Sequence, residues 1–226
     1  MPSQPSGQKP LSNAGPWPSQ GGPFGRNLSN FAGIVTAVLV LVGGDIMAGS
    51  TKTITLPGPS FRGDQSLEQS LQRRRSFRRF LEAPLSLGEI AQLAWAAQGV
   101  THPEGLRTAP SAGALYPLEL YLVAGQVTGL EPGVYRYRPA DHGLEPHASG
   151  DRREALARAS LGQSWIADAA AIYVFAAIYE RSSWKYGRRA RRYVQLEAGH
   201  AGQNLFLQAE ALGLGTVVVG AFDDDE

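Results

Sequence analysis

Beyond residue 50, the pattern of apolar and polar positions alternates between helical and strand spacing. Three capping boxes, each a short polar side chain followed three residues later by Gln or Glu, predict helix starts at Ser66, Ser86 and Asp151. After Ser86, apolar residues between positions 90 and 97 recur at helical spacing, so one face of that helix is predicted to be buried. The longest helix is predicted from a seam of apolar or small residues at positions 194, 198, 201, 205, 209 and 212.

Apolar and β-branched runs between these helices predict strands. Residues 118–123 and 134–137 are predicted to be strands, joined through a turn that includes Pro132 and Gly133. Residues 170–178 are apolar on both faces, which predicts a strand in the middle of a sheet. Because helices and strands alternate without a strict βαβ repeat, the sequence predicts an α+β sandwich.

The first 50 residues differ in kind from the rest. Residues 1–30 are predicted to be a disordered tail. The segment is rich in Pro, Gly, Ser and Gln and therefore has too little apolar surface to bury. Residues 31–50 contain an apolar run that is shorter than the roughly 20 residues of a membrane span but suits a signal peptide or anchor. The alternatives are a buried strand or short helix of the domain, or a translation start at Met47. Localisation stays open between export or membrane tethering through this segment and the cytoplasm.

Composition indicates one ordinary globular domain with a tail. The 226 residues are 43% hydrophobic and 18% charged, enough to bury a full core. A net charge of +1 gives no global indication of nucleic-acid binding. The sequence has no cysteine, which excludes disulfides and thiolate catalysis, and its four histidines lack metal-binding spacing, so no metal site is predicted.

Residues 73–78 carry the first chemical signal. They place four arginines and one serine in six positions. Forked guanidinium donors and a small hydroxyl suit a phosphate monoester attached to a hydroxylated chain. A solvated basic helix end is the alternative, because arginines in a last helical turn also favour the helix dipole.

Two further segments combine small or basic residues with possible chemistry. The loop from Pro110 to Ala114 consists of small residues and would let its backbone approach a planar ring closely; the alternative is an ordinary surface turn. Lys185 and Tyr186 lie within the arginine-rich stretch 181–192, for which a solvated helix face or a nucleic-acid surface are the alternatives. The balanced net charge disfavours nucleic acid.

The glycines of residues 213–220 invite comparison with a dinucleotide-binding loop. They precede the apolar run 216–219, whereas a Rossmann loop needs its glycines after a strand and at the start of a helix. NAD binding through such a loop is therefore not predicted.

Taken together, these segments resemble a known family. Residues 74–80, 93–99, 108–117, 197–200 and 220–223 are similar to motifs of the nitroreductase superfamily, and more narrowly of its SagB-like azoline dehydrogenases; the resemblance covers residues 52–226. It implies a nitroreductase-like α/β sandwich with a mostly antiparallel sheet, a long buried helix, bound FMN and a homodimer. Family members continue into a further strand, so the domain at 51–226 is expected to lack its C-terminal end.

The resemblance also implies roles for individual residues. It assigns the phosphate and ribityl chain of FMN to Arg74, Arg75, Ser76 and Arg78. It assigns the surroundings of the flavin ring to two backbone segments, Pro110, Ser111, Ala112 and Gly113 on one side and Val218, Val219, Gly220 and Ala221 on the other. The catalytic base is assigned to Lys185 with Tyr186. Ala114 and Tyr116 depart from the Asn and Gln usual in nitroreductases, which fits the azoline-dehydrogenase branch.

The expected function is thus that of an FMN-dependent oxidoreductase of the SagB-like type, oxidising peptide azolines to azoles. One alternative is an NAD(P)H-dependent reductase of nitro compounds, quinones or flavins. Another is a flavin-binding protein without catalytic activity.

Overall fold

The computed structural model describes residues 32–37 and 52–223, which form a mixed sheet covered by helices on both faces. The seven-stranded sheet has the order β2-β7-β6-β4-β8-β1-β9, and a small second sheet pairs β3 with β5. The strands are β1 (Gly33–Ala37), β2 (Ile54–Thr55), β3 (Leu85–Ser86), β4 (Leu118–Ala124), β5 (Val127–Thr128), β6 (Gly133–Arg138), β7 (Gly143–Ser149), β8 (Ala171–Ala177) and β9 (Gly215–Val219).

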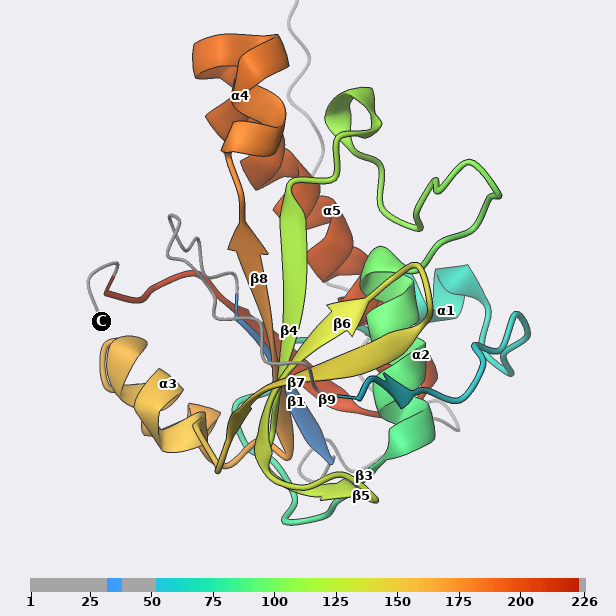
Figure 1. Ribbon diagram of the computed structural model, residues 1–226. Coiled ribbons are helices and arrows are strands. Elements are labelled where there is room, and N and C mark those ends of the chain that lie inside the picture. Colours follow the sequence, from blue (N-terminus) through green and yellow to red (C-terminus); the bar gives the residue numbers. More distant parts are fainter. Residues whose placement is uncertain (1–31, 38–51, 224–226) are drawn as a thin grey trace, which may run out of the picture.

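Five α-helices and three short 3₁₀ turns connect these strands. Figure 1 shows α3 on one side of the sheet and α1, α2 and α5 on the other. The α-helices are α1 (Leu67–Arg73), α2 (Leu87–Gln98), α3 (Arg153–Ala159), α4 (Glu180–Tyr186) and α5 (Ala190–Ala211), and the 3₁₀ turns are η1 (Ala112–Ala114), η2 (Ser164–Ile166) and η3 (Gly187–Arg189).

The large sheet is mostly antiparallel. Antiparallel pairing joins β2, β7, β6, β4 and β8 in that order. Within the described part of this large sheet, only the last part, in which β1 lies between β8 and β9, is parallel. The α+β class and the mostly antiparallel sheet predicted from the sequence are confirmed.

Two of the three predicted capping boxes are present. The Ser66 and Ser86 hydroxyls each accept a hydrogen bond from the backbone amide of the third residue of their helix. The side chain of that residue in turn accepts a hydrogen bond from the backbone amide of the serine. The third box, predicted at Asp151, is wrong. There the carboxylate accepts from the backbone and side chain of Arg153, and helix α3 has Arg152 as its N-cap, so it begins one residue later than the box requires.

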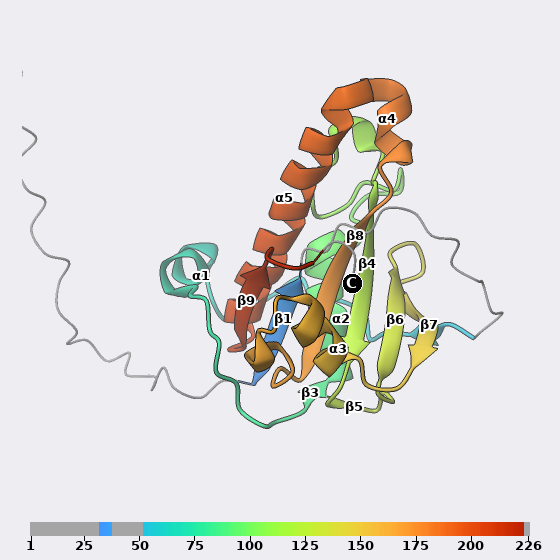
Figure 2. The ribbon, with the colours of Figure 1, turned by 90° about the vertical axis from the view of Figure 1, so that its left-hand side faces the viewer.

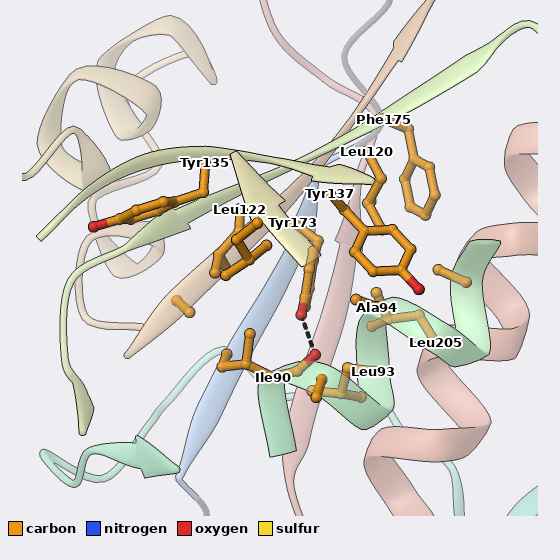
Figure 3. Close-up of a cluster of buried hydrophobic side chains, with 14 of the residues drawn as sticks. Ile90, Leu93, Ala94, Leu120, Leu122, Tyr135, Tyr137, Tyr173, Phe175 and Leu205 are labelled. Atoms are coloured by element: carbon orange, nitrogen blue, oxygen red, sulfur yellow. Dashed lines mark hydrogen bonds between the residues drawn. The ribbon is translucent and has the colours of Figure 1, made fainter. Parts of the chain in front are cut away.

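The main core lies between the sheet and helices α2 and α5. Strand β8 is buried along its whole length, as its two-sided apolar pattern predicts. Figure 3 shows Tyr173 and Phe175 of β8 packed beside side chains of β4 and β6 against α2, with the Tyr173 hydroxyl donating to the Ile90 carbonyl at 2.6 Å. The predicted seam of α5 is buried at Val194, Ala198, Ala201, Leu205 and Ala209.

A second core covers the opposite face of the sheet. It consists of side chains from β4, β8 and β9 that pack against α3 and η2, among them Val123, Ile172, Val217, Ala157 and Ile166. Because strand residues alternate between faces, both faces of β4, β8 and β9 are apolar and these strands read as continuous hydrophobic runs.

Of residues 31–50, for which the sequence predicts a signal peptide or anchor, the structure describes only 32–37. Gly33–Ala37 form strand β1, hydrogen-bonded in parallel to both β8 and β9. These five residues are thus a strand of the domain, as in one of the alternatives, while the signal-peptide or anchor interpretation of the whole segment stays a prediction. The predicted disordered tail at 1–30 and the rest of the apolar segment lie outside the described residues. Within the described part of the chain, no helix is both long and apolar enough to cross a membrane.

Candidate functional site

Two of the four sequence segments meet where α1 ends. Arg74 caps the C-terminus of α1, and the chain that follows runs alongside β9. Ser76 forms a bridge with Thr216, and the backbone amide of Phe77 donates to the Thr216 carbonyl at 3.0 Å. The arginine segment and the strand before Gly220 are therefore neighbours, although about 140 residues separate them in the sequence.

Three of the four guanidiniums of this segment, those of Arg74, Arg75 and Arg78, are held by aromatic rings and backbone carbonyls. Arg74 lies 4.7 Å from the centre of the Phe206 ring, and Arg78 lies 5.7 Å from that of Trp165. The Arg75 guanidinium donates to the carbonyls of residues 72 and 74. None of the three forms an ion pair with a carboxylate of the described residues, so their positive charge is available to an anion.

Residues 218–221 leave the sheet along the same border. The Val218 side chain is 41% exposed, whereas Val219 is buried in the second core. Beyond the strand, Gly220 and Ala221 are exposed, and the Ala221 carbonyl accepts from Gln163 at 3.3 Å. Because Gly220 is exposed and has no side chain, the backbone beyond Val219 leaves room for a flat ligand.

The other two segments meet at the opposite end of α5. The loop after the exposed Pro110 turns tightly at η1, where Gly113 adopts a φ of +65°. Ser111 closes this turn, because its hydroxyl accepts from the amide of Tyr116 at 2.9 Å and its carbonyl from the amide of Ala114 at 3.1 Å. Ala114 and Tyr116 also have positive φ values, a strained conformation that is common at functional loops.

Gly113 lies directly against the proposed catalytic pair. A β-carbon at Gly113 would lie 2.6 Å from the hydroxyl of Tyr186 and 2.8 Å from Nζ of Lys185. Lys185 Nζ also lies 5.5 Å from the centre of the Tyr186 ring, which in turn meets Tyr193 edge to face at 5.0 Å. A glycine is therefore required at this point in the loop, and the ammonium and phenol groups converge on bare backbone.

Helix α5 connects the two halves of the candidate site. Figure 2 shows α4 and the loop before β4 at one end of α5, with α1 and β9 toward the other. The Arg74 contact at Phe206 and the Tyr186 contact at Tyr193 are about 20 Å apart along the helix axis. A cavity of about 300 Å³ lies near the Phe206 end, between α1, α2 and α5, with Ser70, Thr108 and Asn204 on its wall.

Sequence reasoning gave no role to two charged residues beneath the loop. Glu197 of α5 is only 3% exposed, and burial raises its pKa to about 7, while a hydrogen bond from Ser111 and the charge of Arg107 act in the opposite direction. Its Oε1 atom has no hydrogen-bond partner among the described residues. Glu197 follows Val194 by three residues, so helical spacing placed it on the buried face; nothing in the sequence pointed to Arg107.

No group of three His, Asp or Glu side chains within residues 32–37 and 52–223 is placed to hold a metal ion.

Comparison with known proteins gives several relatives. A nitroreductase-like protein of Methanocaldococcus jannaschii is 45% identical over 79% of this chain and 88% of its own length. The microcin B17-processing protein McbC of Escherichia coli is 32% identical, over 52% of this chain and 45% of its own length.

Solved structures give the same result. A nitroreductase-like protein from Ralstonia eutropha superimposes with a TM-score of 0.63 and 30% identity over 79% of both chains. A chain of the Escherichia coli microcin synthetase McbBCD complex, with truncated pro-MccB17 bound, gives 0.52 and 28% over 74% of this chain and 66% of its own. The model of the nitroreductase family matches residues 71–226, and the chain therefore belongs to the nitroreductase family, whose members are generally flavin-dependent oxidoreductases.

Proposed function

We propose that this protein is an FMN-dependent oxidoreductase in which Lys185 and Tyr186 form the catalytic acid–base pair. The observation that carries the proposal is the convergence of Lys185 Nζ and the Tyr186 hydroxyl on the bare backbone of Gly113. A general base needs this kind of placement, within hydrogen-bonding reach of a substrate lying on the loop.

The described residues fit FMN at both ends of the site. Arg74, Arg75 and Arg78 supply guanidiniums without carboxylate partners, which suit a phosphate dianion. At the other end, the small residues 110–113 offer an accessible backbone for the flavin ring. When bound, FMN supplies the hydride acceptor. The protein would bind and orient the cofactor and the substrate, and its side chains would move the protons.

Lys185 and Tyr186 would divide the proton chemistry. An oxidation that removes a C–H hydrogen as hydride also releases a proton, for which Lys185 is the proposed acceptor. The Tyr186 hydroxyl lies close enough to Gly113 to orient the same substrate atom by a hydrogen bond. Because both side chains come from the last turn of α4, they are fixed relative to one another by the helix.

The proposed substrate is a peptide thiazoline or oxazoline, which loses one hydride and one proton to become an azole. The similarity to the microcin B17-processing protein McbC supports this class. We also propose a homodimer, in which the partner completes the flavin site. Leu67 and Leu71 of α1, 60% and 51% exposed, support a contact surface next to the arginine segment.

The test is oxidation of a synthetic thiazoline peptide by the FMN-loaded protein, followed by the mass loss of two hydrogens. We expect Lys185→Ala to abolish azole formation without releasing FMN, and Tyr186→Phe to slow it. Arg188→Ala, which removes another exposed cation three residues away, is the matched control and should remain active. Equal activity of Lys185→Ala and the wild type would refute the catalytic assignment.

A second candidate is an NAD(P)H-dependent reductase of nitro compounds or quinones. The 45% identity to a nitroreductase-like protein favours it. This activity needs no base to remove a substrate proton, so Lys185→Ala would keep NAD(P)H-driven nitro reduction. A wild type that reduces nitro compounds but leaves azoline peptides unchanged would select this candidate.

A further inference from the structure

A basic cavity lies beside the first residues of β4 and the last residues of β6. Its volume is about 430 Å³. Its charged wall consists of four arginines and two carboxylates, namely Arg107, Arg136, Arg138, Arg181, Glu119 and Asp141. Its lining residues come from a loop, two strands and a helix, and only Leu115, Tyr116 and Arg181 belong to segments that the sequence singled out.

Three of the four guanidiniums are neutralised by a carboxylate. Arg136 is paired with Glu145 at 2.6 Å, and Arg138 is paired with Asp141 at 3.0 Å. The third arginine, Arg181, is paired with Glu119. The positive charges of these three arginines are thus largely compensated by carboxylates of the protein itself.

Arg107 is the exception. Its guanidinium donates to the amide oxygen of Gln98 at 2.8 Å and lies 4.4 Å from the centre of the Tyr116 ring. It has no ion pair with a carboxylate in the part of the chain that the structure describes. The backbone amide of Arg107 also donates to the Tyr116 hydroxyl at 3.1 Å, so the fork is held in position. Desolvation by burial lowers the pKa of Arg107, and the charges of Glu119 and Glu197 oppose this shift without forming an ion pair with it.

The cavity adjoins the catalytic pair proposed above. Arg181, on its wall, and Lys185 are one helical turn apart on α4 and so share a face of that helix. Tyr116, also on the wall, belongs to the loop whose Gly113 meets Lys185. The Arg181 guanidinium donates to the Tyr116 carbonyl at 3.3 Å, which joins the two elements.

We propose that this cavity is a subsite for a carboxylate group carried by the substrate, with Arg107 as its principal donor. Because this subsite concerns the substrate of the proposed oxidation, the proposal rests on the proposed function. A guanidinium fork matches a carboxylate with two parallel hydrogen bonds, and a preformed, partly desolvated fork binds more strongly than one that must be ordered. This carboxylate would supply Arg107 with the ion-pair partner that it lacks among the described residues, whereas Arg136, Arg138 and Arg181 already have one.

Binding of a simple probe tests the subsite without catalysis. Benzoate and benzamide are titrated by calorimetry into the FMN-loaded protein. We expect benzoate to bind and benzamide to bind at least about 10-fold more weakly, since a charge-assisted hydrogen bond is lost. Arg107→Gln should weaken benzoate binding by about 10- to 100-fold. The control Arg158→Gln, which removes an exposed arginine on α3, should leave binding unchanged.

Rates of peptide oxidation then distinguish a failure of the subsite from a failure of the proposed function. A thiazoline peptide with a free C-terminal carboxylate is compared with the same peptide as its amide. Preference for the acid that is lost in Arg107→Gln supports the subsite. Oxidation of both peptides at equal rates overturns the subsite and leaves the function standing, whereas benzoate binding without oxidation of either peptide overturns the function alone. Equal binding of benzoate and benzamide by the wild type overturns the subsite even if the variant fails to fold.

Discussion

The buried carboxyl of Glu197 should make the stability of this protein depend on pH, and Glu197→Gln should remove that dependence. The side chain is 3% exposed on α5, and its Oε1 atom has no hydrogen-bond partner in the described part of the chain. Burial raises its pKa from 4.5 to about 7, against the opposing effects of the Ser111 hydrogen bond and the Arg107 charge. The glutamine variant has nearly the same shape and cannot ionise.

The sign of the effect follows from the protons bound in each state. Between about pH 4.5 and pH 7 the unfolded chain loses the Glu197 proton while the folded protein keeps it, so stability falls as pH rises and levels off above the folded pKa. Each pKa unit corresponds to about 1.4 kcal/mol, which gives about 3 kcal/mol for this group. The glutamine also weakens the contact with Ser111, by about 1 kcal/mol. At about pH 8 the variant should therefore be the more stable by about 2 kcal/mol.

Urea unfolding followed by tryptophan fluorescence measures this difference, because the chain has four tryptophans. The wild type and Glu197→Gln are compared at about pH 5 and about pH 8, so that titration of all other groups cancels between them. The exposed Glu154→Gln of α3 is the matched control and should show the same difference from the wild type at both pH values. A stability difference between Glu197→Gln and the wild type that does not change with pH would refute the reasoning.

Three further substitutions test the local structure. Gly113→Ala should destabilise by about 1–2 kcal/mol and reduce activity, measured by unfolding and turnover, because φ is +65° and the new methyl would meet the Tyr186 hydroxyl at 2.6 Å; unchanged turnover would contradict this. Ser86→Ala should cost about 1 kcal/mol in urea unfolding through loss of the α2 cap, with Ser86→Asp retaining it. Tyr173→Phe should lower stability by about 1 kcal/mol, since its hydroxyl donates to the Ile90 carbonyl at 2.6 Å; a thermal melt identical to that of the wild type would argue against this bond.

Local elements could be predicted from the sequence because short-range chemistry decides them. The boxes at Ser66 and Ser86 involve residues three positions apart, and both are present in the structure. The seam of α5 and the two-sided apolar run of β8 are periodic patterns, and both elements are buried as predicted. The Asp151 box failed because Arg153 bonds that carboxylate with its side chain as well as its backbone, which no spacing rule describes.

The positions of segments relative to one another were decided only by the tertiary structure. The apolar run that contains Gly33–Ala37 is compatible with a signal peptide, an anchor or a strand of the domain, and the pairing of these five residues with β8 and β9 is seen only in the tertiary structure. The sequence singled out four segments but could not show how they pair along α5. In the structure the arginine segment lies beside β9, and the loop at Gly113 lies against Lys185 and Tyr186. Arg107 gained its significance because it forms no ion pair with a carboxylate among the described residues, and this depends on contacts between residues far apart in the chain.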